Sequence, residues 1–510
     1  MKQPYDVADP IARPFYLIGI AAMPVDMREQ SSSLNAAGLR EDAEIARAIE
    51  TILTRVQAAQ ADIDQIRPAT AAGREQLQHW LDRQAQVKGK PAWYPYVGSG
   101  LGNGPFVELM DGSVKLDLIN GIGVSMFGHS DPDLIETAIR AAISDTTMQG
   151  NLQFNSDAIE FGEFLLEEAV RTSRLKHAFI INSGALANET ALKICMQKKD
   201  GKAPRIIAFN DCFMGRTTTM CQIGDSAAGR DGIPLNTFVD YMPFYDHELG
   251  EDSIAVACNR LRDMIARYPG QHACFAMELI QGEGGYNTAP REFFVALMEL
   301  CREHDIPVWL DEIQTFGRTT AMFHFDALNL GEYVDVVTVG KITQVCACLY
   351  TEELNPKPGL LSATFIGSSV ALQVGRRMLE RLRDGGHYGK TGHNQQLFDA
   401  FSECIKDVRS QHPEWFGSVL HPATSQPLQK AKHIGGAGGM MRFTPFGGVK
   451  KKIIDATHAL FDEGIICFSC GHGPYHIRFL PPIGVMQPRH FKEVAQPIIE
   501  RALARVHAAG

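Results

Sequence analysis

A lysine follows directly after an apolar, β-branched segment. Residues 336–339 are Val-Val-Thr-Val, a composition typical of a buried strand, and Gly340 and Lys341 come next. Ligands of open α/β sheets bind where strands end. A lysine in such a partly dry site favours its neutral amine, which can attack a carbonyl group. The alternative is a solvated lysine that opens a loop, because charged residues at strand ends are usually exposed.

A second apolar segment, residues 306–310, is followed by Asp311, Glu312 and, shortly after, Gln314. A carboxylate at a strand end can keep a heterocyclic nitrogen protonated, as the pyridine ring of pyridoxal phosphate requires if it is to act as an electron sink. The alternative is an acid pair that caps the next turn. Asp311 and Lys341 at two strand ends together favour a cofactor site more than either does alone.

Residues 182–190 (NSGALANET) lie between a predicted strand and a predicted helix. Small residues let the backbone approach an anion, and a helix N-terminus supplies free N–H groups. Ser183 either caps this helix, which is the commoner case, or donates its hydroxyl to a phosphate.

At this point a family resemblance is clear. Residues 310–319 (LDEIQTFGRT) resemble the signature of the class III pyridoxal-phosphate aminotransferases, and residues 340–346 (GKITQVC) are similar to the lysine-bearing segment of the lysine 6-aminotransferases. The resemblance covers the chain from about Tyr94 to the C-terminus. It implies the α/β, fold-type I architecture, with a mostly parallel sheet in a large cofactor domain and a smaller α+β domain from both chain ends. It also implies pyridoxal 5'-phosphate as the cofactor.

The resemblance also implies roles for particular residues. Lys341 would hold the cofactor as a Schiff base and then act as general base and acid. Asp311 would keep the ring nitrogen charged, and Thr364, in residues 362–369 (SATFIGSS), would reach the other subunit's phosphate in a homodimer. The full set of implied cofactor-binding residues is Ser183, Gly184, Ala185, Phe213, Asp311, Gln314, Lys341 and Thr364.

Three further residues are implied to bind substrate. Arg216, in residues 211–217 (DCFMGRT), is suited to a bidentate grip on a carboxylate, although a surface arginine is the alternative. Glu283 would be a switch carboxylate whose partner is Arg478. Residues 278–285 (ELIQGEGG) depart from the family at Leu279, where proline is usual.

The resemblance therefore implies ping-pong transfer of a terminal amino group, with L-lysine as the leading donor and 2-oxoglutarate as the acceptor. Ornithine, 4-aminobutyrate, diaminobutyrate and polyamine donors stay open, because fold and cofactor do not fix the substrate. An aminomutase, a racemase and a non-catalytic protein of the same fold are less favoured. A nucleotide-binding dehydrogenase is disfavoured because no Gly-x-Gly-x-x-Gly follows a predicted strand.

Composition indicates which binding partners and which cellular compartment to expect. The chain has 510 residues and a formal net charge of −10, with no long run of Lys or Arg, so nucleic acid and anionic membranes are poor candidate partners. No apolar stretch approaches the length of a membrane span, and the short apolar patch near residues 15–25 lacks the features of a signal peptide. Eleven scattered cysteines suit a reduced, cytoplasmic protein.

One cysteine pair has the spacing of zinc ligands. Cys467 and Cys470 form a C-x-x-C motif, and His472 follows. No second pair of similar spacing completes a tetrahedral site, so no metal is expected.

The pattern predicts four segments. Residues 1–90 form an N-terminal helical extension, with helices over 43–66 and around 76–87. Residues 91–160 form the N-terminal part of the small domain, residues 161–375 the large cofactor domain, and residues 376–510 the C-terminal small domain. The large domain alternates strands and helices, with strands expected over 177–181, 205–209, 274–278, 308–310 and 334–339.

Overall fold

The structure is a computed structural model that describes residues 34–145, 148–421 and 423–509. The chain divides into two compact units, residues 1–52 and residues 53–510, each considered by itself. The apolar patch near residues 15–25 lies outside the described residues. The division of the chain at residues 91, 161 and 376 stays a prediction.

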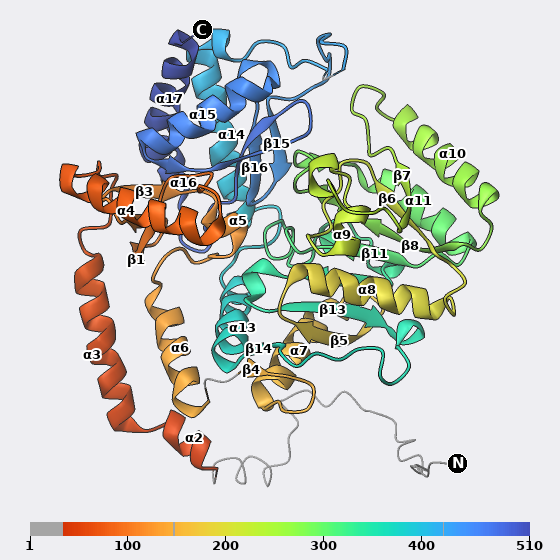
Figure 1. Cartoon of the computed structure of the whole chain (residues 1–510), viewed down its shortest axis with the longest axis horizontal. Coiled ribbons are helices and arrows are strands. Elements are labelled where there is room, and N and C mark those ends of the chain that lie inside the picture. The colour runs from red at the N-terminus through yellow and green to blue at the C-terminus, as the bar shows by residue number, and fades with distance from the viewer. Residues whose placement is uncertain (1–33, 146–147, 422, 510) are drawn as a thin grey trace. The chain divides into compact units, whose positions relative to one another are not determined.

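A seven-stranded sheet forms the centre of the larger unit (Figure 1), in the order β5-β13-β12-β11-β8-β6-β7. The strands from β12 to β7 run parallel, whereas β13 is antiparallel to both of its neighbours. All five predicted strands are present in this sheet, so the predicted α/β class is confirmed. The strands are β5 (Leu175–Ile181), β6 (Arg205–Phe209), β7 (Phe238–Met242), β8 (His272–Met277), β11 (Val308–Asp311), β12 (Val336–Val339) and β13 (Cys346–Thr351).

Helices link and cover these strands. Strands β8, β11, β12 and β13 are buried at every position, as expected when both faces of a sheet are covered. Helix α8 connects the edge strand β5 to β6, so its N-terminus lies just after a strand end. The helices of this region are α7 (Ser156–Ala169), α8 (Gly184–Lys198), α9 (Thr218–Ile223), α10 (Asp252–Arg267), α11 (Arg291–Glu303), α12 (His324–Ala327) and α13 (Ser369–Asp384).

Two four-stranded sheets accompany the seven-stranded one, and the first combines early and late parts of the chain. In the first, β17 of the C-terminal region pairs in parallel with β3. The connection between β2 and β3 contains Asp111-Gly112, a dipeptide typical of hairpin turns. The sheets are β1 (Gly98–Asn103), β2 (Phe106–Leu109), β3 (Val114–Asp117) and β17 (Ile465–Ile466), and β15 (Ile434–Ala437), β16 (Met440–Phe443), β19 (His476–Phe479) and β18 (Phe468–Cys470). The short pairs are β4 (Met148–Gln149) with β14 (Gly367–Ser368) and β9 (Ile280–Gln281) with β10 (Asn287–Thr288).

The remaining helices include those predicted in the N-terminal region. The helices expected over 43–66 and around 76–87 are α3 and α4, and Asp131 caps α6 by accepting a hydrogen bond from the N–H of Leu134 at 3.1 Å. They are α2 (Asn35–Arg40), α3 (Ala43–Gln60), α4 (Ala71–Lys88), α5 (Asn120–Gly123), α6 (Pro132–Ser144), α14 (His393–Gln411), α15 (Lys450–Glu463), α16 (Pro488–His490) and α17 (Gln496–Ala508).

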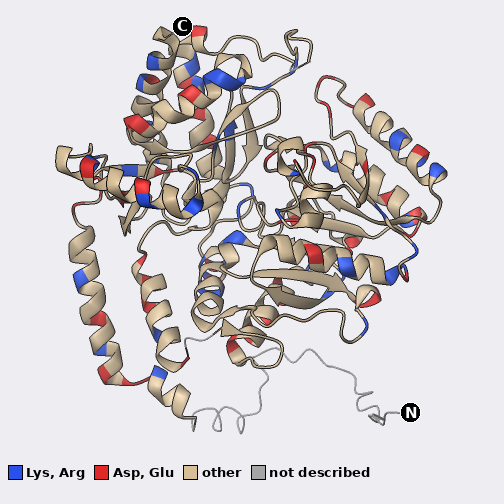
Figure 2. Ribbon diagram, in the orientation of Figure 1, with Lys and Arg blue, Asp and Glu red and all other residues tan. Residues whose placement is uncertain are grey.

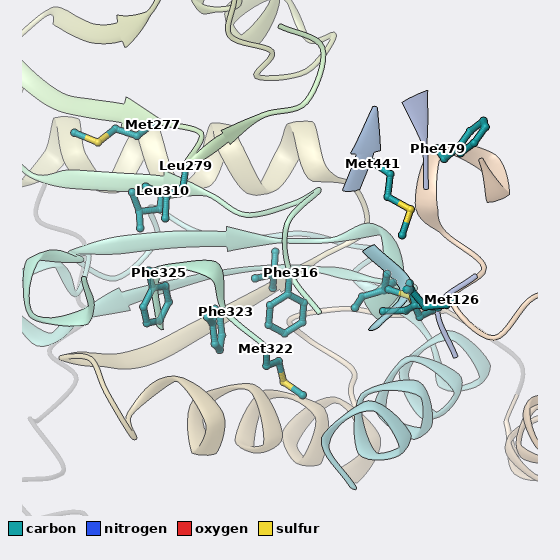
Figure 3. Packing of buried hydrophobic residues seen from close by; sticks show 14 of the residues in the cluster. Met126, Met277, Leu279, Leu310, Phe316, Met322, Phe323, Phe325, Met441 and Phe479 are labelled. Atoms are coloured by element: carbon teal, nitrogen blue, oxygen red, sulfur yellow. The ribbon is translucent and has the colours of Figure 1, made fainter. Parts of the chain in front are cut away.

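A row of aromatic side chains fixes the loop after β11. Figure 3 shows Phe316, Phe323 and Phe325 beside one another, with ring centroids 4.7 Å and 4.8 Å apart along the row. The buried carboxylate of Glu312 accepts hydrogen bonds from the N–H groups of His324 (2.6 Å) and Phe325 (2.7 Å). Glu312 is therefore a loop-fixing residue, and burial raises its pKa to about 7 although these hydrogen bonds oppose the shift.

Acidic and basic residues are interspersed along the helices. Figure 2 shows both signs within single helices such as α10. Within the described residues, none of the helices has the length and apolar character that a membrane span requires.

A close helix contact supports the turn that carries Lys341. A Cβ atom added to Gly375 in α13 would overlap the carbonyl of Thr343 in that turn. We expect Gly375→Ala to lower the free energy of unfolding by about 1–3 kcal/mol despite the higher helix propensity of alanine, and to loosen the turn. Urea unfolding measures the change. Gly162→Ala in α7, where the added Cβ meets only Ile180 at 3.9 Å, is the control and should be neutral or stabilising.

Candidate active site

Lys341 lies immediately after β12 in a strained turn, the short 3-10 helix Lys341–Thr343. Its φ is +58° and that of Gln344 is +61°, values uncommon for residues with a side chain. Burial lowers the pKa of the Lys341 amine, and the guanidinium of Arg318 lowers it further. The neutral amine, which is the nucleophilic form, is therefore favoured at this strand end.

Asp311 ends β11, the strand beside β12, and its carboxylate is buried. It accepts hydrogen bonds from the side-chain amide of Asn188 at 2.7 Å and from the N–H of Ile313 at 2.9 Å. Burial raises the pKa of Asp311 to about 6, whereas these hydrogen bonds and the charge of Lys341 oppose the shift. A cation placed against this carboxylate would stabilise the ionised form.

Asn188 holds Asp311 in place, a role that the sequence analysis did not predict. The Asn188 amide also donates to the carbonyl of Met214 at 2.7 Å, and the hydroxyl of Thr338 donates to its oxygen at 2.7 Å. These bonds join α8, the Met214 loop, β11 and β12 around one buried side chain. Its position one turn into α8, facing the sheet, was the only available signal.

The N-terminus of α8 has the geometry of an anion site. Ser183 is the N-cap, and its hydroxyl accepts from the N–H of Leu186 at 3.3 Å. The N–H groups of Gly184 and Ala185 have no helical carbonyl to bind, as in the first turn of any helix. A Cβ on Gly215, in the loop after β6, would lie 2.7 Å from that of Ala185. Glycine is therefore needed where this loop approaches residues 183–185 at the α8 N-terminus, which we call the phosphate cradle.

Phe213 and Arg216 lie in the loop after β6, next to this cradle. The buried carboxylate of Glu278 accepts from the N–H of Phe213 at 2.8 Å and from that of Gly282 at 2.9 Å. Burial raises the pKa of Glu278 to about 8, and the nearby Asp311 adds to the shift. Arg216 is exposed, with its guanidinium carbon 5.2 Å from the centre of the Phe213 ring. Glu278 therefore couples the Phe213 loop to the Glu283 loop, a role that sequence analysis missed.

Arg478 and Glu283 form the predicted pair. An Arg478 Nη atom lies 2.7 Å from a carboxylate oxygen of Glu283, and Arg478 is fully buried whereas 32% of the Glu283 side chain is exposed. Burial lowers the pKa of Arg478, but the negative charge of Glu283 raises it by more, so the pKa of Arg478 lies above its usual value. A fully buried cation with a partly exposed carboxylate partner suits an exchange of carboxylates.

The last two predicted residues are Gln314 and Thr364. The side-chain oxygen of Gln314 is buried and has no hydrogen-bond partner in the described structure. Thr364 is exposed and lines a cavity of about 400 Å³ together with Asn182 and Leu186 of the cradle segment. The predicted reach of Thr364 into another subunit stays a prediction.

The C-x-x-C pair with zinc-ligand spacing consists of two buried cysteines. Cys467 and Cys470 are buried free thiols, and His472 pairs with Asp211 at 3.0 Å. Across the part of the chain that the structure describes, no group of His, Cys, Asp and Glu side chains could hold a metal ion.

These residues fit pyridoxal phosphate. The α8 N-terminus offers N–H donors for a phosphate, the buried Asp311 can pair with a ring N–H, and the unpartnered Gln314 oxygen shows a polar group awaiting a ligand. The amine of Lys341 has no hydrogen bond or ion pair within the described residues and is available to the aldehyde.

Comparisons with known proteins point to one family. The family model described as aminotransferase class-III matches residues 97–503. The acetylornithine aminotransferase of Myxococcus xanthus is 32% identical over 297 residues, which cover 56% of this chain and 69% of that protein. The acetylornithine aminotransferase of Caldanaerobacter subterraneus subsp. tengcongensis is 26% identical over 400 residues, which cover 76% of this chain and 90% of that protein.

Solved structures agree on the fold. The ornithine aminotransferase of Toxoplasma gondii ME49 has a TM-score of 0.69 at 21% identity, covering 85% of this chain and 96% of that one. The lysine aminotransferase of M. tuberculosis has a TM-score of 0.67 at 22% identity, covering 84% of this chain and 98% of that one. At these identities the likeness establishes the fold, which is fold type I.

The raised pKa of Asp311 predicts a pH effect on the cofactor-free protein. The folded state binds this proton more tightly than the unfolded state, so its stabilising contribution is full below pH about 4 and is lost as pH rises through about 6. We expect the free energy of unfolding to fall, relative to Asp311→Asn, by about 3 kcal/mol between pH 4 and 8. Urea unfolding of both proteins measures this; a difference that does not vary with pH would contradict it.

Proposed function

The chain belongs to the class III aminotransferase family, and we propose that it moves a terminal amino group from a diamino donor to 2-oxoglutarate. The observation that carries this proposal is the buried Arg478 paired with the half-exposed Glu283. That pair lies close enough to Lys341 to affect the pKa of its amine.

L-lysine is our leading donor because residues 340–346 resemble the lysine 6-aminotransferases. The acetylornithine aminotransferases among the relatives favour ornithine-type donors as the second candidate. Both kinds of donor carry a carboxylate remote from the reacting amine. A site with two arginines suits such substrates, and Arg216 and Arg478 supply them.

The protein's own residues divide the chemistry. Bound pyridoxal phosphate supplies an electrophilic carbonyl carbon and a ring that withdraws electrons. Lys341 would bind that carbon and, once released, would carry the proton that moves between donor and cofactor. Asp311, held by Asn188, would keep the ring nitrogen protonated, and Phe213 would pack on the ring. The α8 N-terminus with Ser183, Gly184 and Ala185 would hold the phosphate.

Glu283 and Arg478 would let one site accept two kinds of substrate. With an amine donor bound, Glu283 stays on Arg478 and neutralises it, while the remote carboxylate of the donor binds Arg216. With 2-oxoglutarate bound, Glu283 moves away and Arg478 binds the α-carboxylate. The exposure of Glu283 supports this movement, because solvent can receive the released carboxylate.

We also propose a homodimer in the cytoplasm. Large apolar side chains are exposed around β4 and the Thr364 segment: Met148, Leu152, Phe154, Ile159 and Phe365. The side chain of Asn151 accepts from the N–H of Ala363 at 2.8 Å, so these two segments form one surface near the phosphate cradle. A second copy would cover this surface and bring its Thr364 to the cradle. The free, buried state of all eleven cysteines suits a reducing compartment.

The proposed switch predicts that substitutions of Arg478 and of Glu283 slow different half-reactions. Arg478→Ala removes the cation that receives the α-carboxylate, so the rate with 2-oxoglutarate should fall about 100-fold or more, from the cost of an unpaired charge. Glu283→Gln cannot neutralise Arg478, so the rate with the amine donor should fall more than the rate with 2-oxoglutarate. Single-turnover absorbance changes measure each half-reaction.

Two results decide this test. Arg501→Gln, which breaks a surface pair with Glu463, is the control and should change neither rate. Full activity of Arg478→Ala in the keto-acid half-reaction would rule out the switch.

The proposed homodimer predicts that a charge placed on its surface lowers the molecular mass of the protein in solution. Phe365→Asp places a charge on the exposed apolar surface and should convert the dimer to monomer, with weaker binding of cofactor because Thr364 of the other copy is lost. Light scattering after size-exclusion chromatography measures the mass. Leu235→Asp, at another exposed apolar residue, is the control and should leave the dimer intact. A native protein that is monomeric at all concentrations would contradict the proposal.

A further inference from the structure

Tyr286 carries an unexplained polar atom beside the Arg478 pair. Only 1% of the residue is exposed, and its hydroxyl is buried with no hydrogen-bond partner in the described structure. A buried hydroxyl without a partner costs about 1–3 kcal/mol, and such groups in native proteins usually have a role or a ligand.

The backbone places this side chain at some cost. Tyr286 has a φ of +53°, in the left-handed region, and follows Gly285, whose φ is +125°. Its N–H donates to the carbonyl of Gln281 at 2.8 Å, which closes the turn between β9 and β10. The same turn carries Glu283. Strain of this kind persists where function or packing requires one geometry, and here it fixes the phenol relative to the switch carboxylate.

The electrostatic surroundings of Tyr286 favour an anion. The guanidinium carbon of Arg478 lies 5.9 Å from the centre of the Tyr286 ring. Burial raises the pKa of Tyr286, and Arg478 and Arg318 both act against that shift, so both cations lie near the phenol. Arg318 is buried and has no carboxylate partner among the described residues, and the Nε atoms of both arginines are also without partners.

Space for a ligand adjoins this group. Tyr286 and Gly284 line a cavity of about 840 Å³, and Gly284 follows Glu283 directly. A carboxylate that displaced Glu283 from Arg478 would lie near unpartnered donors, namely the Tyr286 hydroxyl and the Nε atom of Arg478. When Glu283 occupies Arg478, as in this structure, the phenol stays unpaired.

We propose that the Tyr286 hydroxyl donates a hydrogen bond to the substrate carboxylate that replaces Glu283 on Arg478. This inference rests on the proposed function and adds a specificity-determining residue to it. The hydroxyl gains a partner only in the acceptor-bound state, so it shifts the Glu283 switch towards dicarboxylic 2-oxo acids. Donor amines, which leave Glu283 in place, gain nothing from it.

The test uses the full-length holoenzyme and glutarate, a five-carbon dicarboxylate that cannot react. Tyr286→Phe removes only the hydroxyl, and we expect calorimetry to show glutarate binding about 10- to 100-fold weaker, the range of a hydrogen bond to a charged group. The KM for 2-oxoglutarate should rise similarly, whereas the KM for the amine donor should change less than about threefold, because Glu283 still covers Arg478 in that state. Without dicarboxylate the Tm should be unchanged or higher, because an unpaired polar group is gone.

Tyr333→Phe is the matched control. Its hydroxyl is paired, donating to Glu299 at 2.6 Å, so the variant should leave glutarate affinity unchanged. Equal glutarate binding by native and Tyr286→Phe proteins, or equal rises in both KM values, would overturn the inference and leave the proposed function standing. Native holoenzyme that binds no glutarate and transfers no amino group would overturn both.

Discussion

The hydrogen bond from Asn188 to Asp311 fixes the centre of the molecule. It places a carboxylate in a buried position, where ionisation is unfavourable until a cation arrives. The same amide binds the Met214 loop and Thr338 of β12, the strand that leads to Lys341. Asn188 therefore positions the Asp311 carboxylate, the loop that carries Phe213 and the strand that leads to Lys341. The cofactor supplies the positive charge that this arrangement lacks.

A second group of buried charges lies between the β9–β10 turn and β19. Arg478 is held by Glu283 and by the carbonyl of Gly282, with one nitrogen unpaired. Replacing Glu283 by a substrate carboxylate keeps the cation neutralised, so the exchange avoids exposing an unpaired buried charge. In the proposed exchange, the Tyr286 phenol would make the two states unequal and so give the exchange a preferred direction for each substrate.

The sequence predicted well what depends on local pattern. The strand before Lys341 and the strand ending in Asp311 follow from apolar, β-branched runs. The Arg478–Glu283 pair followed only from the family resemblance, because the two residues are far apart in the chain. Asn188, Glu278 and Tyr286 escaped prediction because their roles arise from tertiary contacts that neither periodicity nor spacing encodes. Short pairs such as β4 with β14 also carry too few residues to show a pattern.

The most direct test of the central claim is a single-turnover spectral titration of the purified protein with L-lysine, L-ornithine, N-acetylornithine, 4-aminobutyrate, diaminobutyrate and putrescine. We expect a visible cofactor band that is absent from Lys341→Ala, that L-lysine abolishes fastest, and that 2-oxoglutarate restores. A faster donor from the panel would contradict the choice of L-lysine. A protein that shows no cofactor band after pyridoxal phosphate is added, or whose band no amine changes, would contradict the account as a whole.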